Sequence, residues 1–313
     1  MAFRIVIGDV TIGIQGQDFA YIFSVGMGGM ESLYKDGKEW LSRAPRPAFW
    51  RAATDNDRGN GFVFRSAVWS AADRFVRCVK VAARMDEQEI SMPPAPENNK
   101  YNGDETCDRF EISYTYETPT VPVTEVTVSY LVESDGRIHV QVDYLGKQGL
   151  PELPVLGLRF LMPTAAEGYT YEGLSGETYP DRMAGGIHGV YEVQGLPVTP
   201  YMVPQDCGMH MQTKWLEIVR KTSLDNTDRG GRSSRLKITA EEGKHFAFSC
   251  LPYTAQELEN AMHHEELPPA RRTVVSILGA VRGVGGINSW GADVEDAYHI
   301  SGEQDITYGF WIE

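Results

Sequence analysis

Cysteine is scarce in this chain of 313 residues, and it is not arranged for metal binding. The four cysteines, Cys78, Cys107, Cys207 and Cys250, lie far apart, and no two of them form a C-x-x-C pair. A metal site built from thiolates is therefore not expected. A chain of this length can bury a large hydrophobic core, so it does not need a disulfide framework either.

Basic residues and long apolar segments are also in short supply. The 29 Lys and Arg residues are outnumbered by 43 Asp and Glu residues, which gives a formal net charge of −14. This balance argues against a nucleic-acid partner, because phosphate binding needs clustered basic side chains. No run of about 18 apolar residues is present to cross a membrane. Residues 1–9 become polar too early for a secretory signal. The sequence predicts a cytoplasmic protein with no nucleic-acid or membrane partner.

Strand patterns dominate what is present. Aromatic side chains alternate along residues 19–23, which predicts a strand with one buried face. Asp-Gly at residues 36–37 and again at residues 135–136 is a strong hairpin signal. Around the second turn, apolar and polar residues alternate from 126 to 144. One face of that hairpin is therefore expected to be exposed to solvent, as is common in antiparallel sheets.

Helical patterns are few. Apolar residues recur at helical spacing over 64–75, and Thr254 with Glu257 forms a capping box before a second short helix. Residues 84–108 are polar and contain three prolines, which predicts a long loop. Many short antiparallel strands with scarce helices indicate an all-β sandwich. We expect one domain over residues 1–313.

The segment at residues 283–290 reads G-V-G-G-I-N-S-W, a glycine-dense turn that ends in Trp290. Glycines permit a positive φ and close approach of the backbone to a neighbour. The indole would then be a rigid apolar plate with one N–H donor, which suits the apolar face and polar rim of a pyranose. The alternative is a tight loop around a buried core tryptophan.

Four segments together resemble motifs of the large bacterial β-galactosidases, in the same order along the chain. The family segments are R-A-P-x-D-N-D-x-G, E-N-Y-P-D-R, P-x-E/D-x-G and a C-terminal glycine-rich signature ending in Ser-Trp. Their counterparts here are F-W-R-A-A-T-D-N-D-R-G at 49–59, E-T-Y-P-D-R at 177–182, P-Q-D-C-G at 204–208 and residues 283–290. The likeness covers the family's C-terminal domain alone, and most resembles the separate small subunit of the two-chain enzymes.

The resemblance implies an antiparallel β-supersandwich similar to that of galactose mutarotases. It also implies a role as the small subunit of a heteromeric β-galactosidase that hydrolyses terminal β-D-galactosides such as lactose. The catalytic glutamates, the magnesium ion and a monovalent cation would then belong to the large subunit. We accordingly expect no catalytic residue and no bound cofactor in this chain. It would be inactive alone, and it would complete the substrate pocket and the assembly of the enzyme.

Hydrolysis with retention needs two carboxylates about 5–5.5 Å apart. If residues 55–57 were extended, Asp55 and Asp57 would share a face about 6.5–7 Å apart. Asp-Asn-Asp before glycine also forms side-chain-to-backbone turns readily, and we favour that structural role. The four pairs close enough in sequence to be considered are Asp55/Asp57, Glu177/Asp181, Glu241/Glu242 and Glu265/Glu266.

The resemblance assigns two segments to the substrate pocket. Trp290, with its neighbours Asn288 and Ser289, would contact the sugar. A mobile loop beside the active site would include Asp55, Asn56, Asp57, Gly59, Asn60 and Gly61, and would extend to about residue 64.

The chain departs from the family at two positions. His210 stands where many relatives have arginine, and Asn288 stands where they often have an acidic residue, so no role is carried over to His210. For Tyr179, Asp181 and Arg182 we expect a buried ion pair beneath an aromatic lid, and we favour this structural role over sugar contact.

Two other functions remain open. The chain could be an aldose 1-epimerase-like enzyme that uses a histidine and a carboxylate as acid and base. Seven histidines are available, although none lies in a recognisable motif of that family. It could also be a non-catalytic carbohydrate-binding module.

Overall fold

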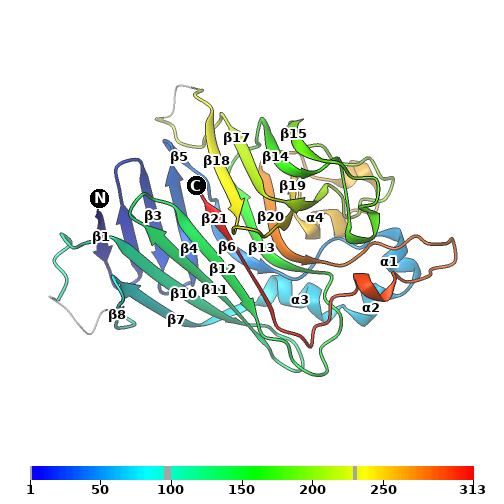
Figure 1. Cartoon of the computed structure of the whole chain (residues 1–313), viewed down its shortest axis with the longest axis horizontal. Helices are drawn as coiled ribbons and strands as arrows, with labels where there is room; N and C mark the ends of the chain where they lie inside the picture. The colour runs from blue at the N-terminus through cyan, green and yellow to red at the C-terminus, as the bar shows by residue number, and fades with distance from the viewer. Residues whose placement is uncertain (1, 95–99, 228–230) are drawn as a thin grey trace.

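A computed structural model describes residues 2–94, 100–227 and 231–313. Its strands form three sheets in which all the pairings are antiparallel. The largest sheet has ten strands, most of which are labelled in Figure 1. In spatial order its strands are β15 (His188–Gln194), β14 (Gly168–Leu174), β17 (Trp215–Arg220), β18 (Ser234–Ala240), β21 (Ile306–Ile312), β12 (Ile138–Tyr144), β11 (Glu125–Glu133), β10 (Arg109–Glu117), β7 (Arg77–Met85) and β8 (Gln88–Ile90).

Two smaller sheets lie side by side and form the second layer. The five-stranded sheet runs β16 (Met209–Thr213), β19 (Phe246–Leu251), β20 (Thr273–Val281), β13 (Val155–Met162) and β6 (Arg43–Ala48). The six-stranded sheet runs β5 (Lys38–Glu39), β4 (Gly29–Lys35), β3 (Phe19–Ser24), β2 (Thr11–Gln15), β1 (Phe3–Ile7) and β9 (Thr106–Cys107).

Aromatic contacts between the layers define the core. Phe23 of β3 packs on Phe110 of β10 with ring centroids 5.7 Å apart. Phe160 of β13 meets Phe310 of β21 at 6.3 Å. One hydrophobic cluster includes buried residues from both layers, from Phe3 near one end of the chain to Ile312 near the other. The molecule is an all-β sandwich, as predicted.

Both Asp-Gly hairpins are confirmed. Asp36 and Gly37 have φ values of 50° and 75° and connect β4 to β5. β11 pairs with β12 across the second turn, and buried residues alternate with half-exposed ones along both strands. The first turn was predictable because a left-handed backbone at two successive residues favours Asp-Gly, whereas in the second turn only Gly136 has a positive φ, of 82°.

The helices are short and differ in part from the prediction. They are α1 (Asp55–Gly59), α2 (Phe62–Arg65), α3 (Val68–Phe75) and α4 (Ala255–Asn260), with 3₁₀ turns η2 (Pro180–Arg182), η3 (His264–Glu266) and η4 (Asp296–Tyr298). The capping box of α4 is confirmed. The helix expected over 64–75 is confirmed over residues 68–75, as α3. It does not extend back to residue 64, because the chain breaks between α2 and α3, and Phe64 and Phe75 are exposed.

The loop expected over 84–108 was wrong at both ends. β7 continues to Met85, β8 pairs back on it, and β9 pairs with β1. Residues 95–99 of that segment lie outside the described residues. Throughout the described ranges, no helix is both long enough and apolar enough to cross a membrane.

Candidate functional site

A buried ion cluster centred on Asp57 joins two segments that are far apart in sequence. Thr54 caps α1, and its capping box with Asp57 places the aspartate in the first helical turn. The Asp57 carboxylate accepts from Arg51 Nη1 at 2.6 Å and from Arg282 Nη1 at 3.4 Å. Arg282 follows β20 immediately, so the cluster ties α1 to the start of the glycine-rich segment.

The cluster keeps its charges although it is almost completely buried. Burial alone would raise the pKa of Asp57, but Arg51 and the hydrogen bonds from Thr54 outweigh it, and the pKa lies below its ordinary value. Burial likewise opposes the charge of Arg51, and Asp57 more than offsets it, so the pKa of Arg51 is raised. A buried carboxylate held by two arginines is a structural element, because loss of one partner leaves an uncompensated charge.

The glycine-rich segment is fastened along its first half. Arg51 Nη2 donates to the carbonyl of Gly283 at 3.2 Å, and Asn56 Nδ2 donates to that of Val284 at 3.0 Å. Asp181 Oδ1 and Oδ2 accept from the N–H groups of Val284 and Gly285 at 2.9 and 2.8 Å. The first two contacts come from Arg51 and from α1, and the other two come from η2.

Arg182 makes a further contact, a hydrogen bond from its guanidinium to the carbonyl of Gly285. The ion pair expected between Asp181 and Arg182 is therefore wrong, because both side chains bind the backbone of the glycine-rich segment. Tyr179 is buried, as expected, and its hydroxyl donates to Asp206 Oδ2 at 2.9 Å.

Beyond these anchors the segment projects into solvent. Trp290 is 89% exposed and Ile287 is 58% exposed, so the alternative of a buried core tryptophan is wrong. Asn288 Oδ1 accepts from the N–H groups of Trp290 and Ala292 at 2.9 and 3.3 Å. The side-chain amide oxygen of Asn288 thus holds the turn together, and the neighbouring Ser289 is exposed.

The segment at 59–64 lies against this turn and is packed into helices. Gly59 ends α1, Gly61 has a φ of 76°, and α2 follows. Asn60 Nδ2 donates to Asp293 Oδ1 at 3.1 Å. A Cβ added at Gly291 would lie only 2.8 Å from the Gly59 carbonyl oxygen, so the two segments touch through glycine backbone.

The four carboxylate pairs have different surroundings. In the Glu177/Asp181 pair, Glu177 accepts from the Thr199 hydroxyl, whereas Asp181 binds the backbone of the glycine-rich segment. Asp55 is 74% exposed and Asp57 is 1% exposed, and in a helix residues two apart do not face each other, so the extended geometry was wrong. Glu241 lies in a turn after β18 and accepts from His139 at 2.8 Å. Glu265 and Glu266 are exposed in η3, as expected.

Residues of the P-Q-D-C-G segment also contact this site. Gln205 Oε1 accepts from the N–H of Asp55 at 2.7 Å. Burial raises the pKa of Asp206 to about 6, against the nearby charge of Arg51 and the hydrogen bond from Tyr179. The first three family-like segments therefore converge around α1.

His210 lies outside this cluster. Its Nε2 is 3.0 Å from the hydroxyl of Tyr169, and its ring stacks on Phe248 with centroids 4.7 Å apart. Burial lowers the pKa of His210 to about 4, so the ring is neutral at physiological pH. It acts as an aromatic core residue with one polar contact.

Sequence reasoning missed Arg282 and the residues around it. Besides Asp57, this side chain contacts Asp293 and Glu152, and it lies 3.9 Å over the ring of Phe62. The available signal was a charged residue directly after an apolar strand. Across the described part of the chain, no three His, Cys, Asp or Glu side chains gather as a metal-binding group.

Comparison with known proteins identifies the family. The sequence profile of the β-galactosidase small chain matches residues 15–312. A β-galactosidase small subunit from Latilactobacillus sakei is 58% identical over 98% of this chain and 96% of that protein. β-Galactosidases from Streptococcus thermophilus and Halalkalibacterium halodurans are 32% and 33% identical over 99% of this chain, which spans 27% and 28% of their lengths.

Among solved structures, a galactose mutarotase-like protein from Lactobacillus casei aligns with a TM-score of 0.41 and 10% identity. The alignment covers 97% of this chain and 99% of that one. The family assignment itself rests on the profile match and on the sequence relatives. The chain belongs to the β-galactosidase small-chain family.

Proposed function

We propose that this chain is the small subunit of a heteromeric β-galactosidase acting on terminal β-D-galactosides such as lactose. In that assembly it supplies Trp290 to the substrate pocket from outside the catalytic domain. The observation that carries the proposal is the exposed Trp290 indole at the end of a segment that is fastened by Arg51 and Asp181. The catalytic glutamates, magnesium and a monovalent cation would be held by the large subunit.

The geometry suits stacking against a sugar. An indole plate offers an apolar surface to the C–H face of a galactosyl or aglycone ring. Because the backbone from Gly283 to Gly285 is already fixed by Arg51, Asp181 and Arg182, little ordering would accompany binding. Ser289 would add a hydroxyl at the polar rim.

The same end of the molecule carries an exposed apolar surface that fits a protein partner. Phe64 of α2 is 83% exposed, and α2 is tied to the Trp290 turn by the 2.6 Å ion pair of Arg65 with Asp293. Figure 1 shows α1, α2 and the loop after β20 at one end of the sandwich. Exposed large apolar side chains at an interaction site are covered when the partner binds, so we propose that the large subunit docks at this end.

A cytoplasmic location belongs to the same proposal. All four cysteines are free thiols, and the three at positions 107, 207 and 250 are buried. Proteins with unpaired cysteines are typical of a reducing compartment.

Mixing experiments test the assignment. β-Galactosidase activity should appear only when this chain is combined with a large subunit and magnesium. Activity of this chain alone would contradict the proposal. If neither preparation were active, polarimetric assay of galactose mutarotation and calorimetry with galactose would test the epimerase and carbohydrate-binding alternatives.

Trp290→Ala is the sharper test of the pocket role. Loss of one aromatic contact should lower kcat/KM of the assembled enzyme about threefold to tenfold, since such contacts contribute about 0.5–1.5 kcal/mol. Sedimentation should show unchanged assembly. Leu224→Ala, another exposed apolar side chain, is the control and should leave kinetics unaltered. Unchanged kinetics in the Trp290 variant would remove the tryptophan from the pocket.

A further inference from the structure

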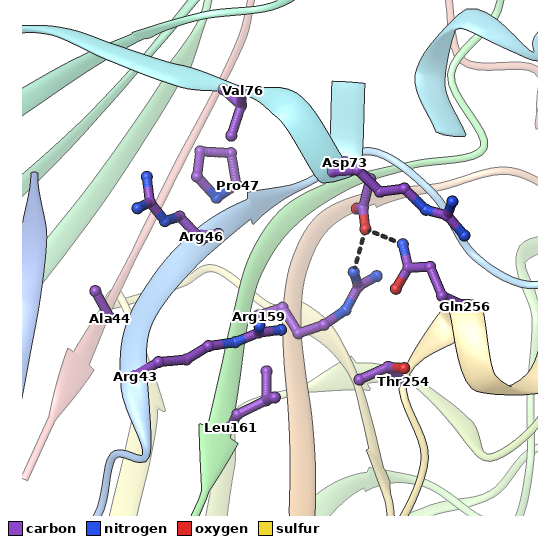
Figure 2. A pocket seen from close by; sticks show the side chains of 11 residues that line it. Arg43, Ala44, Arg46, Pro47, Asp73, Val76, Arg159, Leu161, Thr254 and Gln256 are labelled. Atoms are coloured by element: carbon purple, nitrogen blue, oxygen red, sulfur yellow. Dashed lines mark hydrogen bonds and ion pairs between the residues drawn. The ribbon is translucent and has the colours of Figure 1, made fainter. Parts of the chain in front are cut away.

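An arginine-rich cavity lies at the edge of the five-stranded sheet, beside β6. Its volume is about 420 Å³. It is bounded by β6, β13, α3 and the capped start of α4, as Figure 2 shows. The charged and polar side chains that line it are Arg43, Arg46, Asp73, Arg74, Arg159, Thr254 and Gln256.

The one carboxylate in this lining is fully used by other groups. Asp73 Oδ1 accepts from the N–H groups of Phe49 and Trp50 at 3.0 and 3.3 Å. Its Oδ2 accepts from Arg159 at 2.7 Å and from Gln256 at 2.6 Å, the two bonds drawn in Figure 2. Asp73 thus neutralises Arg159 and has no lone pair left for another arginine.

Arg43 and Arg46 add further positive charge to this lining. Within the described ranges, neither guanidinium has a hydrogen bond or ion pair to a side-chain carboxylate, although Arg46 lies 5.7 Å over the ring of Tyr116. Arg46 is also the direct cross-strand partner of Arg159. Like charges in that position are destabilising. Burial, followed by repulsion from Arg272, Arg159 and Arg46, lowers the pKa of Arg43.

We propose that this cavity binds a small oxyanion, inorganic phosphate or a phosphate monoester, with the Arg43 guanidinium as its main contact and Arg46 adding positive charge at the rim. A guanidinium fork matches phosphate oxygens in geometry and charge. The bound anion would offset the repulsion between β6 and β13. The cavity exceeds the size of phosphate alone, so it has room for the organic part of a sugar phosphate. None of the residues that line this cavity belongs to the Trp290 turn.

Thermal unfolding provides the first test. In buffer free of phosphate, Arg43→Gln should raise Tm by about 2 °C, because the substitution relieves repulsion. Added phosphate should raise the Tm of the unaltered chain but not that of the variant, so the order of stability reverses. Sodium chloride at equal ionic strength should not reproduce the reversal. Arg235→Gln, on the exposed face of β18, changes the same charge and should still respond to phosphate.

Isothermal titration calorimetry with inorganic phosphate and with glucose 6-phosphate completes the test. We expect one site per chain, weakened about tenfold or more in Arg43→Gln/Arg46→Gln, since a hydrogen bond to a charged group contributes about 1.5–3 kcal/mol. Tighter binding of glucose 6-phosphate than of phosphate would assign the site to sugar phosphates. Equal binding of the two would show that the site recognises the phosphate group alone. Absence of binding by both, or equal binding by the double variant, would overturn the proposal.

Discussion

Asp57 shows how a residue can look catalytic in sequence and be structural in the fold. It lies in a D-N-D-R-G run, yet its carboxylate is enclosed by Arg51, Arg282 and the Thr54 cap. Removing one partner of a buried ion pair typically costs about 3–5 kcal/mol, because the other charge stays buried. A substitution here should therefore act on stability first.

We expect Asp57→Asn to lower the free energy of unfolding by about 3–5 kcal/mol, measured by urea denaturation. Asp55→Asn is the matched control two residues away. Its carboxylate is exposed and 3.4 Å from Arg58, so the change should stay within about 0.5 kcal/mol. Equal effects of the two substitutions would contradict the structural role of Asp57.

His210 should make stability depend on pH. Its pKa of about 4 in the fold lies below its ordinary value of 6.5. The unfolded chain therefore binds the proton first, and the stability present above pH 6.5 is lost as pH falls toward 4. The shift corresponds to roughly 3 kcal/mol. His210→Gln should lack this slope.

The comparison must be made between variants, because Asp206 acts in the opposite direction. The pKa of Asp206, about 6, exceeds the ordinary value of 3.8. The contribution of Asp206 to the stability of the fold therefore falls as pH rises from 3.8 to 6. Denaturant titrations of both proteins from pH 4 to 7 isolate the histidine. Parallel pH profiles would show that the buried ring of His210 does not govern acid stability.

At the scale of elements, η2 acts as a clamp on the glycine-rich segment. Asp181→Ala removes the acceptor of two backbone N–H groups, those of Val284 and Gly285. Amide hydrogen exchange at these two positions should accelerate, and kcat/KM of the assembled enzyme should fall in the same direction as for Trp290→Ala. Unchanged exchange would show that Arg51 and Arg182 hold the segment without Asp181.

Glu177→Ala is the control for this clamp. Glu177 belongs to the same E-T-Y-P-D-R run, but its carboxylate is exposed and accepts from Thr199 at 2.7 Å. It should leave exchange at Val284 and Gly285 unaltered.

The elements that could be predicted from the sequence were those specified by neighbours in the chain. The Asp36-Gly37 and Asp135-Gly136 hairpins and the Thr254 cap are local, and each was correct. The partners of Asp181 lie more than 100 residues away in sequence, so an ion pair with its neighbour Arg182 was the local but wrong expectation. Arg282 was missed for the same reason, and the pocket role of Trp290 rests on family resemblance.

At the scale of the whole molecule, the ten-stranded sheet is assembled from two groups of strands. β7, β8, β10, β11 and β12 form one group, and β14, β15, β17 and β18 form the other. β21 lies between β12 and β18, and Ile312 pairs with both Ile138 and Ile238. Its side chains Phe310 and Ile312 are fully buried.

The position of β21 has a consequence for biosynthesis. Chains are made from the N-terminus, and completed segments begin to fold during translation. The two groups of strands cannot join until residues 306–312 have been made, so the nascent chain would carry two unpaired sheet edges until then. Such edges promote aggregation. The small chain would therefore depend on rapid synthesis of β21, and chaperone binding to the nascent chain should peak just before β21 emerges from the ribosome.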